Sequence, residues 1–342
     1  MNLTFTVIVP AYNASATLPL CLKALQEEPE QNKEIIVVDD CSTDGTAEIA
    51  HSMGVQVIQT AKRSGPAAAR NLGAEKAAGE ILVFVDADVV IHKGSISLIQ
   101  HILQNDKLAA VFGSYDDEPA EQNFLSQYKN LLHHFVHHNS SEDASTFWAG
   151  CGAIRKDLFV SVNGFNSADY PHPSIEDIEL GVRLKQKKLF IRLDKRLQGK
   201  HLKKWSVLSL LKADILYRAY PWSRLIADMG EVPNQLNLHS SHRFSALLAA
   251  LFFAVVLTGI VFPSWSIVLQ ATLLLALVIF LNRSLYAFFL HKKGLLFLTG
   301  AIFWHMLYYV YSGIVFVYCW IRYRVFSFGG RASLRAMRSE NR

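Results

Sequence analysis

Cysteine is scarce in this sequence, and its spacing fits no common cysteine framework. The four cysteines are far apart and form no C-x-x-C or Cys/His pattern: Cys21, Cys41, Cys151 and Cys319. Structural zinc sites and disulfide-stapled folds need closer or more regular cysteines, so the pattern argues against both. A reducing compartment fits this usage best.

Two phosphate-binding signatures are also missing. No G-x-G-x-x-G follows the first apolar segment, and no G-x-x-x-x-G-K-[ST] occurs. These absences argue against a dinucleotide-binding enzyme and a P-loop protein. The first residues, MNLTFTVIVPAYN, have no basic region before their short apolar run, which argues against a signal peptide. We therefore expect the N-terminal part to stay in the cytosol.

Charge is absent from long stretches of the last third of the chain. Three runs contain no Asp, Glu, Lys or Arg: 244–262, 265–281 and 295–320. Each is long enough to cross or nearly cross a bilayer core of ~30 Å. We expect a transmembrane region over 244–321, with a basic tail at 322–342. Residues 206–243 are expected to form interfacial helices and a linker, although a soluble helix packed on the preceding domain is an alternative.

The sequence is consistent with a C-terminus on either side of the membrane. Three crossings from a cytosolic N-terminus would place the C-terminus outside, whereas the arginine-rich tail favours the cytosol. Either the last run is re-entrant, or it splits, or the charge rule fails here. The formal net charge of +5 is modest, and we expect a membrane partner and no nucleic acid.

Before residue 205 the pattern changes to short apolar segments that alternate with helical ones. The expected strands are Phe5–Val9, which Pro10 ends, then Glu34–Val38, Val55–Ile58 and Ile81–Val85. This alternation predicts an α/β domain over residues 1–205 with a mostly parallel central sheet.

Acidic side chains follow two of the expected strands. Asp39-Asp40 ends one of them, and Asp86-Ala87-Asp88 ends a strand of five apolar residues. Ligands of open α/β sheets sit at the carboxyl ends of strands, and paired carboxylates there suit a divalent cation that holds a phosphorylated ligand. Alternatively, the Asp86–Asp88 pair caps the helix that begins near Gly94.

Five blocks of the sequence carry a family resemblance. They read VIVPAYN, EIIVVDDCSTDGT, SGPAAARNLGAEKAAGEILVFVDAD, GCGAIRKDLFVSVNGFN and IEDIELGVRLKQK. In this order and spacing they resemble the family 2 glycosyltransferases with the GT-A fold, from Leu3 to about His201. The resemblance implies a GT-A nucleotide-sugar-binding domain and Mg²⁺ or Mn²⁺ as cofactor. It also implies an inverting transfer from a nucleotide-diphosphate sugar, with a UDP-sugar favoured.

The resemblance also assigns roles to residues. It implies that Asp177 is the general base that takes the proton of the acceptor hydroxyl, and that Asp88 and His201 bind the metal. Glu176 would orient Asp177 or replace it. The positions it implies for donor binding are Pro10, Tyr12, Asp39, Asp40, Arg70, Asp86, Ala87, Gly152 and Glu176.

Several of these residues have plainer interpretations from the sequence alone. Tyr12 could be an ordinary aromatic at a strand exit, and Arg70 a solvated helix residue. His201 lies among lysines and could face anionic lipid. Four further histidines, at 133, 134, 137 and 138, form two i, i+4 pairs. Their spacing permits zinc, although no third ligand follows, and a polar face near the acceptor or membrane is the alternative.

We expect the enzyme to transfer a single sugar and not to build a polysaccharide. Processive relatives carry Q-x-x-R-W after the base, where this chain has HLKKW. The apolar runs favour a membrane-associated acceptor, either a lipid or a lipid-linked saccharide. Two other classes remain as alternatives: a non-catalytic membrane-anchored scaffold that binds nucleotide sugar, and a nucleotidyltransferase. The latter would need a glycine-rich basic loop where PAYNASAT stands.

Overall fold

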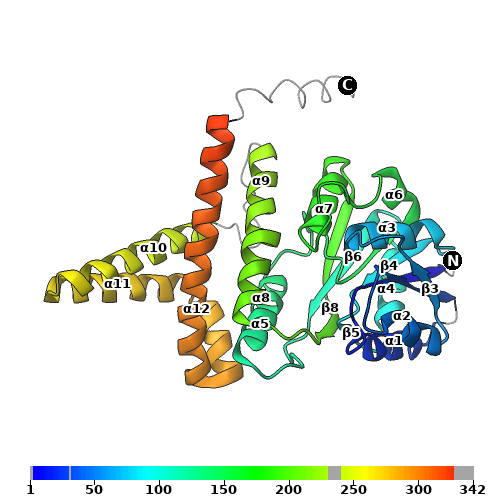
Figure 1. The fold of residues 1–342 in the computed structure, drawn as a ribbon, viewed down its shortest axis with the longest axis horizontal. Helices are drawn as coiled ribbons and strands as arrows, with labels where there is room; N and C mark the ends of the chain where they lie inside the picture. The colour runs from blue at the N-terminus through cyan, green and yellow to red at the C-terminus, as the bar shows by residue number, and fades with distance from the viewer. Residues whose placement is uncertain (1–2, 31, 230–239, 327–342) are drawn as a thin grey trace. The chain divides into compact units, whose positions relative to one another are not determined.

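The computed structural model of the chain describes residues 3–30, 32–229 and 240–326. The chain divides into two compact units, residues 1–207 and 208–342 (Figure 1). Residues 230–239 of the predicted linker and residues 327–342 of the predicted basic tail lie outside the described residues.

The N-terminal unit is built on one sheet, in the strand order β3-β2-β1-β4-β7-β6-β8-β5. Its strands are β1 (Phe5–Ala11), β2 (Lys33–Asp39), β3 (Gln56–Gln59), β4 (Ile81–Val85), β5 (Val89–Ile91), β6 (Leu108–Tyr115), β7 (Cys151–Arg155) and β8 (Phe190–His201). Strands β1 to β4 pair in parallel, as do β6 and β8. Strand β7 runs antiparallel to both of its neighbours, and β5 runs antiparallel to β8. The prediction of an α/β fold is confirmed, with a mixed sheet.

Helices cover both faces of the sheet (Figure 1). They are α1 (Leu18–Gln26), α2 (Thr46–Ser52), α3 (Pro66–Lys76), α4 (Ser95–Leu103), α5 (Phe124–His138), α6 (Lys156–Ser161) and α7 (Glu176–Gln186). Alternate side chains of each central strand enter different cores: Val83 packs with α1 and α4, whereas Phe84 packs with α3, α6 and α7. Burial on both faces explains why β4 is apolar throughout.

Strand β1 continues one residue past Pro10, beyond the predicted end at Val9. Proline lacks an N–H and would weaken a ladder that needed one. The ladder from β1 to β4 ends at the pair Ile8–Phe84, so the strand tolerates Pro10 while its pairing with β2 continues to Ala11.

The C-terminal unit consists of helices. They are α8 (Val207–Lys212), a π-helical stretch (Ala213–Ala219), α9 (Tyr220–Met229), α10 (Ser240–Val261), α11 (Trp265–Leu281) and α12 (Arg283–Phe326). Among the described residues, the segments 241–261 and 283–322 are long and apolar enough to cross a membrane, and α11 is a shorter apolar helix. Helix α12 is interrupted at Gly294, whose φ is +82°. The three predicted apolar runs therefore lie on α10, α11 and α12.

Candidate functional site

The two aspartates after β4 form a turn, and they do not cap helix α4. Val89 N donates to Asp86 O at 2.9 Å, which closes the turn. The N–H groups at the start of α4 are instead taken by the buried Glu28, which accepts from Gly94 N at 2.7 Å and from Ile96 N at 2.8 Å. The helix-cap interpretation is therefore wrong, and the half-buried carboxylates of Asp86 and Asp88 are available for other contacts.

Arg70 joins the strand end to helix α7. It is only 4% exposed, and its Nη2 donates to Asp86 Oδ1 at 2.6 Å while its Nη1 donates to Glu176 Oε1 at 2.9 Å. Burial opposes the charged guanidinium, but the two carboxylates outweigh burial and raise the pKa of Arg70 above its ordinary value. Arg70 is therefore not a solvated helix residue, and both of its terminal nitrogens hold protein carboxylates.

Asp177 lies beside this ion-paired group, in the first turn of α7. Its Oδ2 accepts from Ala149 N at 3.1 Å, and Gly150 O in turn accepts from Asp86 N at 3.2 Å. Burial and the negative charge of Glu176 raise the pKa of Asp177 to about 7, against the opposing effect of Arg70. A carboxyl group with such a pKa can exchange a proton near neutral pH.

His201 ends β8 next to the second aspartate. Its Nε2 lies 3.6 Å from Asp88 Oδ2, and Leu202 N donates to Asp88 O at 2.8 Å. Burial favours the neutral acid, but the hydrogen bond and charge of His201, with Lys203, outweigh it and lower the pKa of Asp88 to about 2. Within residues 3–30, 32–229 and 240–326, no group of three or more His, Cys, Asp or Glu is arranged to hold a metal ion.

Tyr12 lies just past β1, at the same edge of the sheet, and is 40% exposed. The guanidinium carbon of Arg63 lies 3.9 Å from the centroid of its ring. The guanidinium of Arg63 therefore stacks on the ring of Tyr12. A planar nucleotide base could stack there in place of the guanidinium or beside it.

Asp39 and Asp40 are buried at the end of β2 and hold the neighbouring loops. Asp40 accepts from Ser64 N at 2.8 Å and from Gly65 N at 2.7 Å, and Asp39 accepts from Ser42 N at 3.2 Å. Gly65 has a φ of +84°, and a Cβ there would lie 2.3 Å from Pro171 O. Asp40 thus fixes a loop that packs directly on the segment before α7.

Ala87 and Gly152 are enclosed by protein atoms. Ala87 is buried inside the turn after β4. Gly152 lies in β7, where a Cβ would come within 2.5 Å of Trp148 O and 2.7 Å of the Phe147 ring. Packing alone therefore accounts for a glycine at this position.

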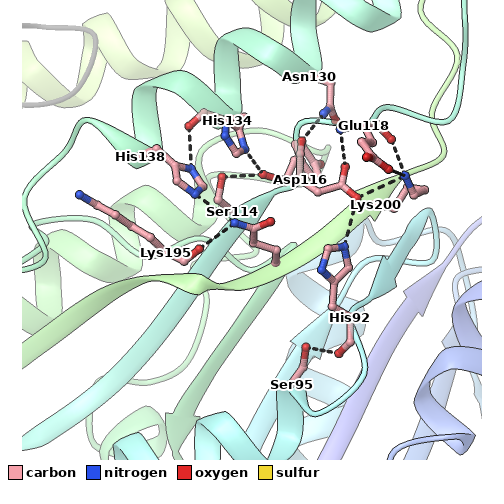
Figure 2. Close-up of polar contacts among 12 residues, drawn as sticks. His92, Ser95, Ser114, Asp116, Glu118, Asn130, His134, His138, Lys195 and Lys200 are labelled. Carbon is pink, nitrogen blue, oxygen red and sulfur yellow. Dashed lines mark hydrogen bonds and ion pairs between the residues drawn. The ribbon is translucent and has the colours of Figure 1, made fainter. Parts of the chain in front are cut away.

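A second polar cluster, which the sequence patterns did not predict, lies where β6 ends beside β8. Asp116 is buried, and its Oδ2 lies 3.1 Å from His92 Nε2 and 3.4 Å from Lys200 Nζ. Figure 2 shows these three side chains pointing toward one another. Asp116 N also donates to Gly199 O at 2.9 Å, which ties the end of β6 to β8 just before His201. The sequence contained a signal, because Asp116 and Asp117 directly follow the largely apolar β6, as Asp86 directly follows β4.

The four histidines of α5 contact carbonyl oxygens and aromatic rings. His134 Nδ1 donates to Tyr115 O at 2.8 Å, and His137 Nδ1 to Gly113 O at 3.0 Å. His138 Nδ1 lies 3.0 Å from His134 O (Figure 2). His133 packs against the ring of Tyr115 at 4.4 Å between centroids. The contacts of His133, His134 and His137 attach α5 to strand β6, which lies between β7 and β8.

The mixed sheet, with acids at its carboxyl edge, has the architecture of the GT-A fold. Residues 6–162, slightly less than half of the chain, match the model of glycosyl transferase family 2. Arg70, Asp86, Glu176 and Asp177 are in one connected group, and Asp88 and His201 adjoin it.

Known proteins resemble the chain in sequence and in fold. An uncharacterised glycosyltransferase of Haemophilus influenzae is 28% identical over 201 residues, which cover 54% of this chain and 63% of that protein. The chain thus spans less than two thirds of this relative. The mannosyltransferase PcManGT from Pyrobaculum calidifontis, solved with GDP-Man and Mn²⁺, superposes with a TM-score of 0.53 at 17% identity, covering 93% of this chain and 88% of PcManGT. S. aureus TarS 1–349, solved with UDP-GlcNAc, gives 0.50 at 19% identity, covering 94% and 91%.

Proposed function

We propose that this protein is an inverting, metal-dependent glycosyltransferase that moves one sugar from a nucleotide-diphosphate sugar to a membrane-associated acceptor. The observation that carries the proposal is the position of Asp177. Its carboxylate is held by Ala149 N and lies next to a group in which Arg70 links Asp86 to Glu176. A base with a raised pKa therefore stands beside the strand-end acids of a glycosyltransferase domain.

Each residue has a separate task in this proposal. Asp177 takes the proton of the acceptor hydroxyl as that oxygen attacks the anomeric carbon, so the configuration inverts in a single displacement. Glu176 keeps the pKa of Asp177 high through its negative charge. Arg70 acts as a positioning residue that holds Asp86 and Glu176 in place. The ring of Tyr12 offers a stacking face for the base, and Asp39 and Asp40 shape the loops around it.

The donor atoms beside Asp88 fit a divalent cation. A carboxylate oxygen and an imidazole nitrogen 3.6 Å apart are both accepted by Mn²⁺, and such ions usually complete their coordination with phosphate oxygens and water. Asp88 and His201 would hold the ion, which would supply positive charge for the departing nucleoside diphosphate. An aspartate carboxylate such as that of Asp88 is ionised at neutral pH, as a metal ligand must be.

Removing the divalent cation is expected to stop the transfer. EDTA should lower the initial rate about 10²-fold or more, because the leaving group loses the charge that stabilises it, and Mn²⁺ or Mg²⁺ should restore the rate. Asp88→Asn should raise the Mn²⁺ concentration for half-maximal rate about tenfold. Asp106→Asn, whose side chain is 96% exposed, is the matched control. Full activity in EDTA would contradict the metal role.

The rate is expected to depend on pH through Asp177. Asp177 accepts a proton only as the carboxylate, and its pKa is raised to about 7. The ratio kcat/KM should therefore rise about tenfold per pH unit below about pH 7 and level off above it. Glu176→Gln removes the neighbouring negative charge, so the midpoint of this profile should move to lower pH. A flat profile between about pH 5.5 and about pH 8.5 would argue against Asp177 as the base.

The apolar helices support a membrane-associated acceptor, either a lipid or a lipid-linked saccharide. We further propose that they span the membrane more than once and keep the catalytic domain in the cytosol. The test is a screen of UDP- and GDP-sugars, with a membrane lipid extract as acceptor, followed by nucleoside diphosphate release. Product formation from one donor would support transfer. Donor binding without product would favour a scaffold, and pyrophosphate release from a nucleoside triphosphate would favour a nucleotidyltransferase.

A further inference from the structure

We propose that Tyr115, His133 and Trp148 form a stacking subsite for a neutral sugar ring of the acceptor. This inference rests on the proposed function, because it takes Asp177 as the base. It narrows the acceptor to a molecule that already carries a sugar, such as a lipid-linked saccharide, rather than a lipid phosphate or lipid hydroxyl alone.

Three aromatic rings from different parts of the chain meet at this place. The ring centroid of Tyr115, at the end of β6, lies 4.8 Å from that of Trp148 and 4.4 Å from that of His133 on α5. The centroids of His133 and Trp148 are 4.9 Å apart. All three residues are only partly buried, although the strands beneath them are closed to solvent. Each of the three residues therefore keeps part of its surface accessible.

A continuous chain of contacts connects these rings to both halves of the proposed chemistry. On one side, Ala149, which directly follows Trp148, donates its N–H to Asp177 at 3.1 Å. On the other side, the ring of Tyr115 stacks on the imidazole of His201 at 4.1 Å between centroids and 11° between planes. The acceptor hydroxyl must reach Asp177, and Trp148 directly precedes the residue that holds Asp177, so a sugar ring that bears this hydroxyl would lie next to the aromatic group.

The indole of Trp148 is held in place by its neighbours. A Cβ at Gly150 would lie 2.5 Å from the indole, so the ring lies directly against the glycine backbone. Gly150 O also accepts from Asp86 N at 3.2 Å, which fixes this backbone to the strand end. A subsite built on an immobilised ring loses little conformational entropy when a ligand binds.

The chemistry of the three side chains favours a neutral carbohydrate. Aromatic faces bind the C–H faces of flat apolar or amphipathic groups, and sites for small ligands combine such rings with a few polar groups. Here the tyrosine hydroxyl supplies a polar atom, and none of the three side chains carries a permanent charge. A phosphate group alone would instead require arginine or lysine at this position.

Saturation-transfer NMR on the full chain in detergent tests the subsite. The probes are methyl glycosides of glucose, galactose, mannose and N-acetylglucosamine, with UDP and Mn²⁺ present. We expect saturation of at least one glycoside by the wild type and by Trp148→Phe, which keeps an aromatic face. Trp148→Leu and Tyr115→Leu should each lower it about fivefold. Phe190→Leu, at an aromatic residue that is 53% exposed, should leave it unchanged.

Binding of UDP with Mn²⁺ to the same samples separates this inference from the proposed function. The subsite is overturned if UDP binds but no glycoside is saturated, or if both leucine variants saturate the glycosides as the wild type does. A wild type that binds no UDP contradicts the proposed function itself, and the subsite with it. A variant that keeps its affinity for UDP is folded, so loss of the glycoside signal in that variant supports the subsite.

Discussion

Replacing Asp177 with asparagine is expected to lower kcat about 10³-fold and to change the affinity for the nucleotide-sugar donor less than about twofold. The amide keeps the size of the side chain and an oxygen that accepts from Ala149 N, but it cannot take a proton from the acceptor. The measurement is kcat for sugar transfer, together with the donor Kd from calorimetry in the presence of Mn²⁺.

Asp169→Asn is the matched control for this variant. Asp169 is an exposed acid in the segment before α7, so its loss should leave kcat unchanged. If Asp177→Asn retained more than about a tenth of the wild-type kcat, another group would have to serve as the base, and Glu176 would be the first to examine.

Replacing Arg70 with methionine is expected to destabilise the N-terminal unit by about 3–5 kcal/mol. The substitution removes the cation that pairs with Asp86 at 2.6 Å and with Glu176 at 2.9 Å, and it leaves two carboxylates without their partner. Pulse proteolysis over a urea series, followed on fragments of this unit, measures the change in free energy of unfolding. Transfer activity should also fall, because Glu176 no longer has a fixed position beside Asp177.

The double variant Arg70→Met with Glu176→Gln distinguishes charge from packing. It should recover part of the lost stability, because one of the two stranded charges is gone. Arg63→Met, at an exposed arginine, should change the free energy of unfolding by less than about 1 kcal/mol. Equal stability of Arg70→Met and the wild type would show that the buried ion pairs do not hold the site together.

Local patterns were sufficient to predict strands β1 to β4, of which β2 and β4 lead into acids of the site. The five apolar residues of β4 predicted a strand buried on both faces, and the acids that follow marked its carboxyl end. Pro10 shows the limit of this reasoning, because proline predicted a strand end although β1 continues to Ala11. A strand tolerates proline where no neighbouring strand needs its missing N–H for a hydrogen bond. The local sequence does not specify which strand is the neighbour.

The partners of the acidic residues came only from the tertiary structure. Arg70 meets Glu176 across 106 positions of sequence, and Tyr115 meets His201 because β6 and β8 are neighbours in the sheet. Glu28 is a further example of a distant partner. Its carboxylate accepts the N–H groups at the start of α4, so Asp86 and Asp88 do not cap that helix. No pattern around any of these residues names its partner.

The sequence by itself thus determined an α/β domain of the GT-A type, the acids at its strand ends and the apolar C-terminal helices. The tertiary structure decided that Arg70 holds two carboxylates, that burial and Glu176 raise the pKa of Asp177, and that the rings of Tyr115, His133 and Trp148 meet. The physical reason is the distance along the chain between the residues that interact. Periodicity and strand ends are properties of neighbouring residues, whereas burial, ion pairs and pKa shifts depend on which distant segments the strand order brings together.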